Sequence, residues 1–173
     1  MLALAGASWL TTAREVRQAN QFTFAAIGEV AALFLGIFLT MQAPIEVLQV
    51  KGRALGLVEP WQFFWASGVL SSFLDNAPTY MVFFETANSL TNQGGPGVLT
   101  LGQGHFIRED LLVALSLGSV FMGAMTYIGN GPNFMVKAIA EERGVRMPSF
   151  FGYMIYSVLI LIPLFLLAQW LFL

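Results

Sequence analysis

The sequence predicts an all-α integral membrane fold with about three transmembrane helices, one re-entrant helical hairpin and one broken helix. Two properties of the 173 residues carry this prediction: 57% are hydrophobic, and only 10% are charged. An ordinary soluble domain has about 25% charged residues. The eight basic and ten acidic side chains are therefore too few to cover the surface of a soluble domain of this length.

Charge balance and residue usage also exclude several functional classes. The net charge is −2, and the sequence has no basic stripe of the kind that binds nucleic acid. The absence of cysteine excludes disulfides, cysteine zinc sites and thiol catalysis. The single histidine, His105, cannot form a histidine-rich metal site. We therefore expect no nucleic-acid partner and no cofactor other than a coupling ion.

Residues 1–21 are expected to form a separate N-terminal segment. Residues 1–10 are apolar but too short to span a membrane, and they lack the basic region and cleavage site of a signal peptide. We interpret the segment as the remnant of a preceding helix, which indicates that the chain is part of a longer protein. Residues 22–173 form the second expected unit.

Residues 22–45 are the first expected span of this unit. A helix of this length reaches about 36 Å, enough to cross a hydrocarbon core of about 30 Å with some tilt. The segment holds one charge, Glu29. Two interpretations of Glu29 stay open: a proton carrier inside the membrane, or a carboxylate at headgroup level.

Residues 61–90 predict the re-entrant hairpin. The first arm, residues 61–74, would reach about 21 Å as a helix, which falls short of the membrane core by about 9 Å. The polar segment 75–79 separates this arm from a second apolar run, residues 80–90. A single broken crossing is the alternative interpretation.

The rest of the chain predicts a loop, a broken helix and a final span. Residues 91–105 are neutral and rich in glycine, which is typical of a loop. The broken helix covers residues 111–140, with its interruption at 128–133, and Gly144 fits the position after its C-terminal cap. Residues 151–173 have no charge and form the clearest span.

The two interruptions share one pattern, because residues 76–79 read NAPT and residues 130–133 read NGPN. Proline ends one helix and supplies the first position of the next, and the preceding asparagine can cap that helix. Each break leaves backbone carbonyls and amides free, which a membrane tolerates only where they are buried in protein or face water. Paired breaks of this kind indicate a transporter binding site, whereas one alone is often a plain kink.

Four ionisable residues need separate interpretation. Asp75 lies between apolar arms, where a carboxylate is costly unless it is paired, solvated or protonated, so we expect an ion or proton ligand. A helix cap in a wet loop is the alternative for Asp75. We expect Glu85 to face Lys137 or water, Lys137 to extend toward the membrane surface, and His105 to be solvated.

Two long segments resemble a transporter family. Residues 71–88 (SSFLDNAPTYMVFFETAN) and 123–157 (GAMTYIGNGPNFMVKAIAEERGVRMPSFFGYMIYS) resemble the C-terminal half of bacterial sodium:proton antiporter and citrate-transporter-like proteins of the ion transporter superfamily. Residues 29–41 resemble the helix before the hairpin in the same proteins. The resemblance implies one of two inverted repeats, and the first repeat is missing. It implies these ion or substrate ligands: Asp75, Asn76, Thr79, Thr126, Asn130 and Asn133.

Within this set, Asp75, Asn76 and Asn130 are the expected Na⁺ ligands. The implied function is secondary active transport by alternating access, as cation-coupled antiport or carboxylate symport, in a multi-pass protein of the inner membrane. Expected partners are the lipid bilayer and a first-repeat half, encoded elsewhere or missing, with a homodimer left open. The alternative is a small membrane scaffold or inactive remnant. An enzyme is not expected, since an intramembrane aspartyl protease needs two embedded aspartates and only Asp75 is embedded.

Overall fold

The computed structural model describes residues 2–19, 32, 35–36, 39–40, 42–43, 46–47, 52–91, 95–142 and 144–173. The chain divides into two compact units, Met1–Leu39 and Thr40–Leu173. The first unit contains helices α1 (Leu2–Thr11) and α2 (Arg14–Ala19). Glu29 and most of the expected span 22–45 lie outside the described residues.

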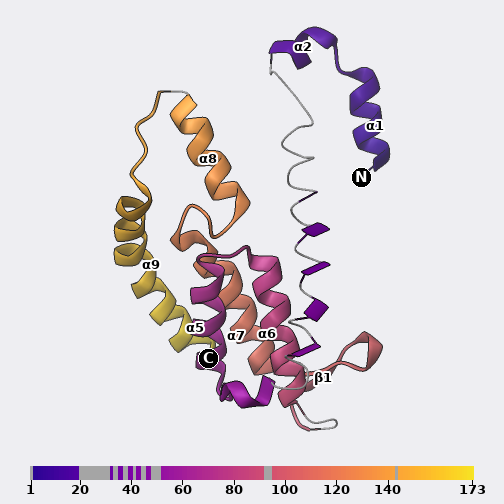
Figure 1. Cartoon of the computed structure of the whole chain (residues 1–173), viewed down its shortest axis with the longest axis vertical. Coiled ribbons are helices and arrows are strands. Elements are labelled where there is room, and N and C mark those ends of the chain that lie inside the picture. The colour runs from indigo at the N-terminus through magenta and orange to yellow at the C-terminus, as the bar shows by residue number, and fades with distance from the viewer. Residues whose placement is uncertain are drawn as a thin grey trace. The chain divides into compact units, whose positions relative to one another are not determined.

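The second unit is mostly helical and carries the candidate site (Figure 1). Its elements follow in the order η1 (Gly52–Leu55), α5 (Pro60–Ser71), α6 (Asn76–Leu90), β1 (Val98–Thr100), η2 (Gly102–Gly104), β2 (Phe106–Arg108), α7 (Glu109–Phe121), η3 (Met122–Met125), α8 (Gly131–Glu142) and α9 (Phe150–Phe172).

Helices α5 and α6 form an antiparallel hairpin, as the sequence predicts. The rings of Phe63 and Phe83, ten residues either side of the turn, are 6.3 Å apart. Helix α5 begins with a proline at its first position. The Gln62 side chain also stabilises this start, because its Oε1 accepts a hydrogen bond from the Glu59 amide at 3.0 Å. The twelve residues of α5 and fifteen of α6 reach only about 18 and 22 Å, too short to cross a membrane individually.

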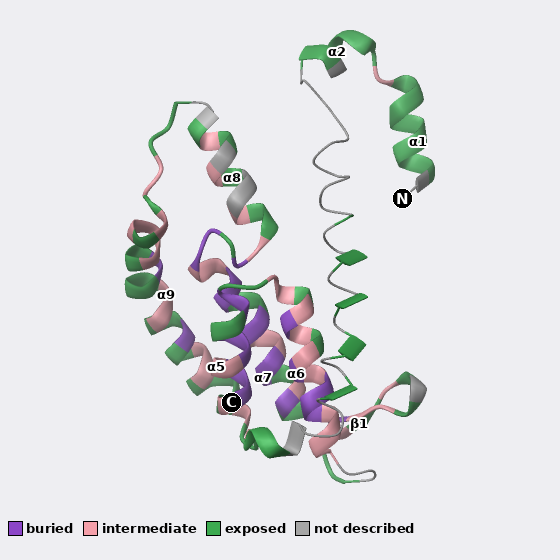
Figure 2. Ribbon diagram, viewed as in Figure 1, coloured by how far each residue is buried: buried purple, intermediate pink, exposed green. Residues whose placement is uncertain are grey.

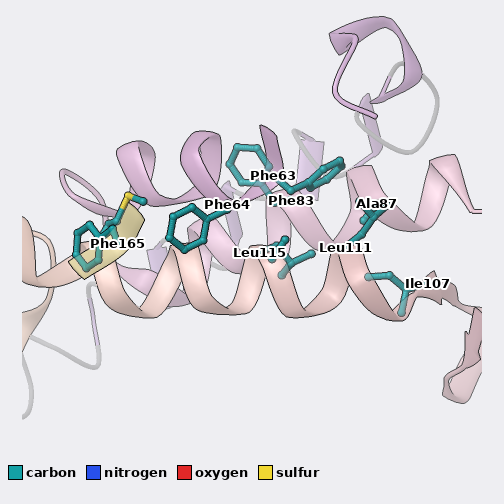
Figure 3. Packing of buried hydrophobic residues seen from close by; sticks show 10 residues of the cluster. Phe63, Phe64, Phe83, Ala87, Ile107, Leu111, Leu115 and Phe165 are labelled. Carbon is teal, nitrogen blue, oxygen red and sulfur yellow. The ribbon is translucent and has the colours of Figure 1, made fainter. Parts of the chain in front are cut away.

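The core lies between α5, α6 and α7 (Figures 2 and 3). Close approach of α5 and α7 depends on Gly118, since a Cβ there would overlap the Phe64 carbonyl oxygen and Ser67 Oγ. Helix α9 joins this core through Phe165 and through a hydrogen bond from Trp65 Nε1 to Gln169 Oε1 at 2.6 Å. The buried cluster comprises Phe63, Phe64, Phe83, Ala87, Ile107, Leu111, Ala114, Leu115, Met122 and Phe165.

A short antiparallel sheet replaces part of the predicted loop, so the all-α prediction is wrong at this point. Strands β1 and β2 pair Leu99 with Ile107, and Ile107 is fully buried in the core. The end of α6 holds β2, because the amide of Phe106 donates to Asn88 Oδ1 at 3.0 Å. His105 is half-buried rather than solvated, with its Nδ1 2.9 Å from Asn88 Nδ2.

The helix expected over 111–140 is interrupted, and the interruption begins earlier than the sequence predicts. Regular α-helix ends at Phe121, continues as the 3₁₀ turn η3 and becomes irregular at 126–130 before α8 begins. The left-handed backbone of Gly144 (φ 80°) and the hydrogen bond from its amide to the Glu141 carbonyl oxygen at 3.0 Å end α8 as predicted.

Helix α9 is the final predicted span. Ser149 caps it, with Oγ accepting from the Gly152 amide at 3.2 Å. Its 23 residues reach about 34 Å. Among the described residues, α9 alone is long and apolar enough to cross a membrane.

Candidate functional site

The turn between α5 and α6 and the break between α7 and α8 meet in one site (Figure 1). The hydroxyl of Thr126 donates to the Ser72 carbonyl oxygen. In return, Ser72 Oγ donates to the Met122 carbonyl oxygen at 3.0 Å. The fold therefore joins the two interruptions that the sequence singled out, although about 50 residues separate them.

Asn76 lies at the centre of this contact as the first residue of α6. In the amide orientation that matches its surroundings, its Nδ2 donates to the carbonyl oxygens of Ser119 at 3.0 Å and Gly129 at 3.2 Å. The Ser119 carbonyl belongs to α7, before the break, and the Gly129 carbonyl lies within the break. The prediction that Asn76 caps α6 is wrong, since the helix begins one residue earlier and Asp75 takes the cap position.

Asn130 and Asn133 organise the start of α8. Asn130 Oδ1 accepts from the Asn133 amide at 3.0 Å, which confirms the predicted asparagine cap at this break. Asn133 Nδ2 reaches back to the carbonyl oxygens of Gly123 at 3.3 Å and Thr126 at 3.2 Å. The two asparagines thus fix both the helix start and the preceding irregular backbone.

The two candidate threonines are both buried, each with 1% of its surface exposed. Thr126 Oγ1 accepts from the amides of Ile128 at 3.2 Å and Gly129 at 3.0 Å. Thr79 Oγ1 donates to the Asp75 carbonyl oxygen at 3.1 Å, one turn back in its own helix. Thr126 therefore links the two interruptions, whereas Thr79 stabilises the first turn of α6.

Backbone carbonyls in the break accept hydrogen bonds from side chains, whereas the sequence predicted free carbonyls. Helix α9 supplies two donors: Tyr153 Oη to the Ala124 oxygen at 3.0 Å, and Ser157 Oγ to the Met125 oxygen at 2.6 Å. Side chains satisfy these groups because unpaired carbonyls are costly where water is absent. Each carbonyl oxygen has a second lone pair, so a cation can still bind beside the existing donor.

Asp75 is the one carboxylate placed at this junction among the described residues. It is half-buried at the cap position of α6, but its side chain makes no capping hydrogen bond. The alternative interpretation of Asp75 as a capping side chain therefore has no support in this geometry. Its carboxylate oxygens can accept a proton or a cation.

Three serines belong to the site although sequence reasoning did not select them. Ser71 Oγ donates to the Ser119 carbonyl oxygen at 2.5 Å, and Ser72 forms the contact to Met122 described above. Ser119 Oγ is buried without a hydrogen-bond partner. The sequence indicates their role only weakly. All three are small polar residues inside otherwise apolar segments, and Ser71 and Ser72 immediately precede the hairpin turn.

Two further ionisable residues lie outside this junction. Lys137 Nζ pairs with Glu141 at 2.7 Å, so the expectation that Lys137 pairs with Glu85 is wrong. Glu85 is buried in α6 with 5% of its surface exposed, which also excludes the water-facing alternative. Within the described part of the chain, no three histidine or acidic side chains gather as a metal cluster.

The depth of the junction follows from α9. Ser157 is the eighth residue of α9, about 10 Å from the start of the helix, and it contacts the break directly. In a membrane-crossing α9 of about 34 Å, this position would lie inside the hydrocarbon core. Carboxylate, amide, hydroxyl and carbonyl oxygens at this depth form a donor set suited to a hard cation or a proton.

Comparison with known proteins identifies the family of the chain. A model of the family described as "Putative citrate transport" matches residues 1–173. No curated protein and no solved structure matches the chain. The family match confirms the predicted resemblance to citrate-transporter-like proteins. Since the match covers all 173 residues, this chain belongs to that citrate-transport family of membrane transport proteins.

Proposed function

We propose that the chain is one repeat of a cation-coupled secondary transporter of the inner membrane, with a carboxylate such as citrate as its cargo. The observation that carries the proposal is the junction itself, where Asn76 from the hairpin bonds the Ser119 carbonyl of α7 and the Gly129 carbonyl inside the break. Discontinuous helices that meet inside the membrane are the usual construction of a transporter site. The family match supports the carboxylate cargo.

Asp75 supplies the charge in this mechanism. With Na⁺ as coupling ion, the Asp75 carboxylate and the side-chain oxygen of Asn76 bind the cation, together with carbonyl oxygens of the break. Asn130 keeps its Oδ1 on the Asn133 amide and shapes the site through the start of α8. With H⁺ as coupling ion, Asp75 binds the proton. Either ion neutralises a carboxylate that is otherwise costly inside the membrane, which couples ion binding to movement of the site.

Alternating access requires a second element against which this repeat moves. We propose that a first-repeat half supplies that element, and a second copy of this chain is the alternative source. Antiport of Na⁺ against H⁺ uses the same carboxylate without an organic cargo. Flux measurements with Na⁺ and pH gradients applied separately distinguish these couplings.

Asp75→Asn tests the proposal. The full chain, alone and together with a first-repeat half, is reconstituted in liposomes, and uptake of labelled citrate is measured under an imposed Na⁺ or pH gradient. We expect Asp75→Asn to abolish gradient-dependent uptake while membrane insertion is retained, because the amide cannot carry the charge. Asp110→Asn is the matched control, since Asp110 is an exposed carboxylate paired with Arg108.

Citrate uptake by Asp75→Asn with an unchanged ion dependence would contradict the site assignment. Absence of citrate and cation flux in every combination would favour the scaffold or inactive remnant.

A further inference from the structure

A second polar cavity lies where α8 and the start of α9 approach the irregular segment. Its volume is about 390 Å³, and its walls include Tyr127, Lys137, Glu141 and Phe150. The charged pair lies on one side, and aromatic and apolar side chains form the remainder. Nothing in the transport mechanism above uses this cavity.

The ion pair of Lys137 and Glu141 has unused hydrogen-bonding positions that can bind a further ligand. Lys137 Nζ donates to Glu141 Oε1 at 2.8 Å and Oε2 at 2.7 Å, and lies 5.5 Å from the centre of the Tyr127 ring. An ammonium has three donors, and a carboxylate accepts about four hydrogen bonds. Each member can therefore bind one more group of opposite charge, which favours a ligand that carries one positive and one negative group.

A separate apolar groove runs along α9 and begins at the residue after Phe150. Its volume is about 460 Å³, and its walls are Phe151, Met154, Ile155, Val158 and Leu159. This spacing places all five side chains on one face of the helix. Phe150 in the cavity and Phe151 in the groove are consecutive residues at the start of α9, and their rings are 5.4 Å apart.

The position of the cavity matches a lipid headgroup. The first turn of α9 borders it, and the uncharged 23 residues of α9 follow as the membrane-crossing helix. The cavity therefore lies at the level of the membrane surface, and the groove extends into the hydrocarbon core. Much of α9 is exposed along its length in the described unit, with Leu159 70% exposed (Figure 2).

We propose that the cavity and groove together bind one glycerophospholipid with an ethanolamine headgroup. The phosphate accepts from Lys137 Nζ, the ammonium donates to the Glu141 carboxylate, and one acyl chain follows the groove. Phosphatidylglycerol would place a phosphate near Glu141 and has no ammonium group that could donate to the Glu141 carboxylate. Phosphatidylcholine has no N–H to donate to Glu141, so charge and hydrogen bonding both favour ethanolamine.

Native mass spectrometry tests this assignment. The full chain is reconstituted in vesicles that contain equal amounts of phosphatidylethanolamine, phosphatidylglycerol and phosphatidylcholine, re-extracted in mild detergent and weighed with its retained lipid. We expect the wild type to retain one phosphatidylethanolamine. Glu141→Gln should retain about tenfold less, the expected cost of one charge-assisted hydrogen bond. Glu15→Gln, an equal change in net charge in α2, should retain the wild-type amount.

A second variant probes the groove without touching the charged pair. Val158→Trp fills the groove and should also release the lipid, whereas Leu167→Trp, on α9 outside the groove, should not. Circular dichroism confirms that each variant keeps its helical content. Equal retention of phosphatidylglycerol, wild-type retention by Glu141→Gln, or a lipid-free dimer that Val158→Trp dissociates would each overturn the proposal. The outcome is independent of transport, since neither residue belongs to the proposed cation site.

Discussion

At the level of single residues, the junction depends as much on side chains that satisfy carbonyls as on the carboxylate of Asp75. Asn76 donates to the carbonyl oxygens of Ser119 in α7 and Gly129 in the break, and Asn133 donates to those of Gly123 and Thr126. The resemblance to the transporter family implied both residues as part of the site. It could not predict what their amides bind, because the acceptors come from backbone that becomes irregular only when the two helices pack together.

Asn76→Ala should destabilise the folded protein while the hairpin still forms. The substitution removes the amide donor from the Gly129 carbonyl, whereas the Ser119 carbonyl keeps its bond from Ser71, and an unsatisfied buried group costs about 1–3 kcal/mol. Thermal unfolding in detergent measures this loss. Gln18→Ala, at an exposed position of α2, provides the comparison and should leave the transition unchanged. An unchanged transition for Asn76→Ala would show that water replaces the amide and that the junction is open.

At the level of elements, apolar length and proline position predicted the hairpin and the broken helix. They failed at the strands β1 and β2, because each has only three residues and β2 depends on hydrogen bonds to Asn88 of α6 and to Thr91, the C-cap of α6. They also placed the end of α7 too late. Residues 122–127 are apolar enough to continue a helix, and the change to 3₁₀ geometry depends on contacts with the hairpin.

Two glycines in the second break should respond differently to alanine. A Cβ at Gly129 would overlap the Gly123 carbonyl oxygen and lie 3.0 Å from that of Ser72, whereas a Cβ at Gly131 meets no atom within 4 Å. Gly129→Ala should therefore destabilise the protein by about 1–3 kcal/mol, as overpacking does, and reduce transport. Gly131→Ala is the matched control and should stay within about 0.5 kcal/mol.

Thermal unfolding and citrate uptake measure both glycine variants. Equal effects of the two substitutions would mean that helix propensity, and not the close approach of the two backbones, determines the break.

At the level of the whole chain, α9 connects the parts of the second unit. Near its start, Tyr153 and Ser157 bond the break, and near its end Gln169 bonds Trp65 of the hairpin. The sequence predicted α9 as a span from its lack of charge but gave no information about these contacts. Pairings between distant segments depend on the complete packing, and no local pattern encodes them.

The antiparallel hairpin makes a prediction about membrane topology. Since the α5 and α6 arms are each too short to cross, both ends of the hairpin should lie on the same side of the membrane. Five of the eight basic residues, together with the loop before α9, are then expected on the side of the membrane opposite the hairpin ends. This excess of positive charge predicts that the opposite side is cytoplasmic. The absence of cysteine allows single cysteines to be introduced for labelling without a background.

Val58→Cys before the hairpin and Thr100→Cys after it, both exposed positions, should react with an impermeant maleimide from the extracytoplasmic side. Val145→Cys, in the exposed turn after α8, should react only after the membrane is opened. Labelling of Val58→Cys and Thr100→Cys from opposite sides would mean that residues 61–90 cross the membrane once. In that case Asp75 would lie in the middle of a broken crossing. The path by which an ion reaches the junction from each side of the membrane would then differ from the one that a re-entrant hairpin provides.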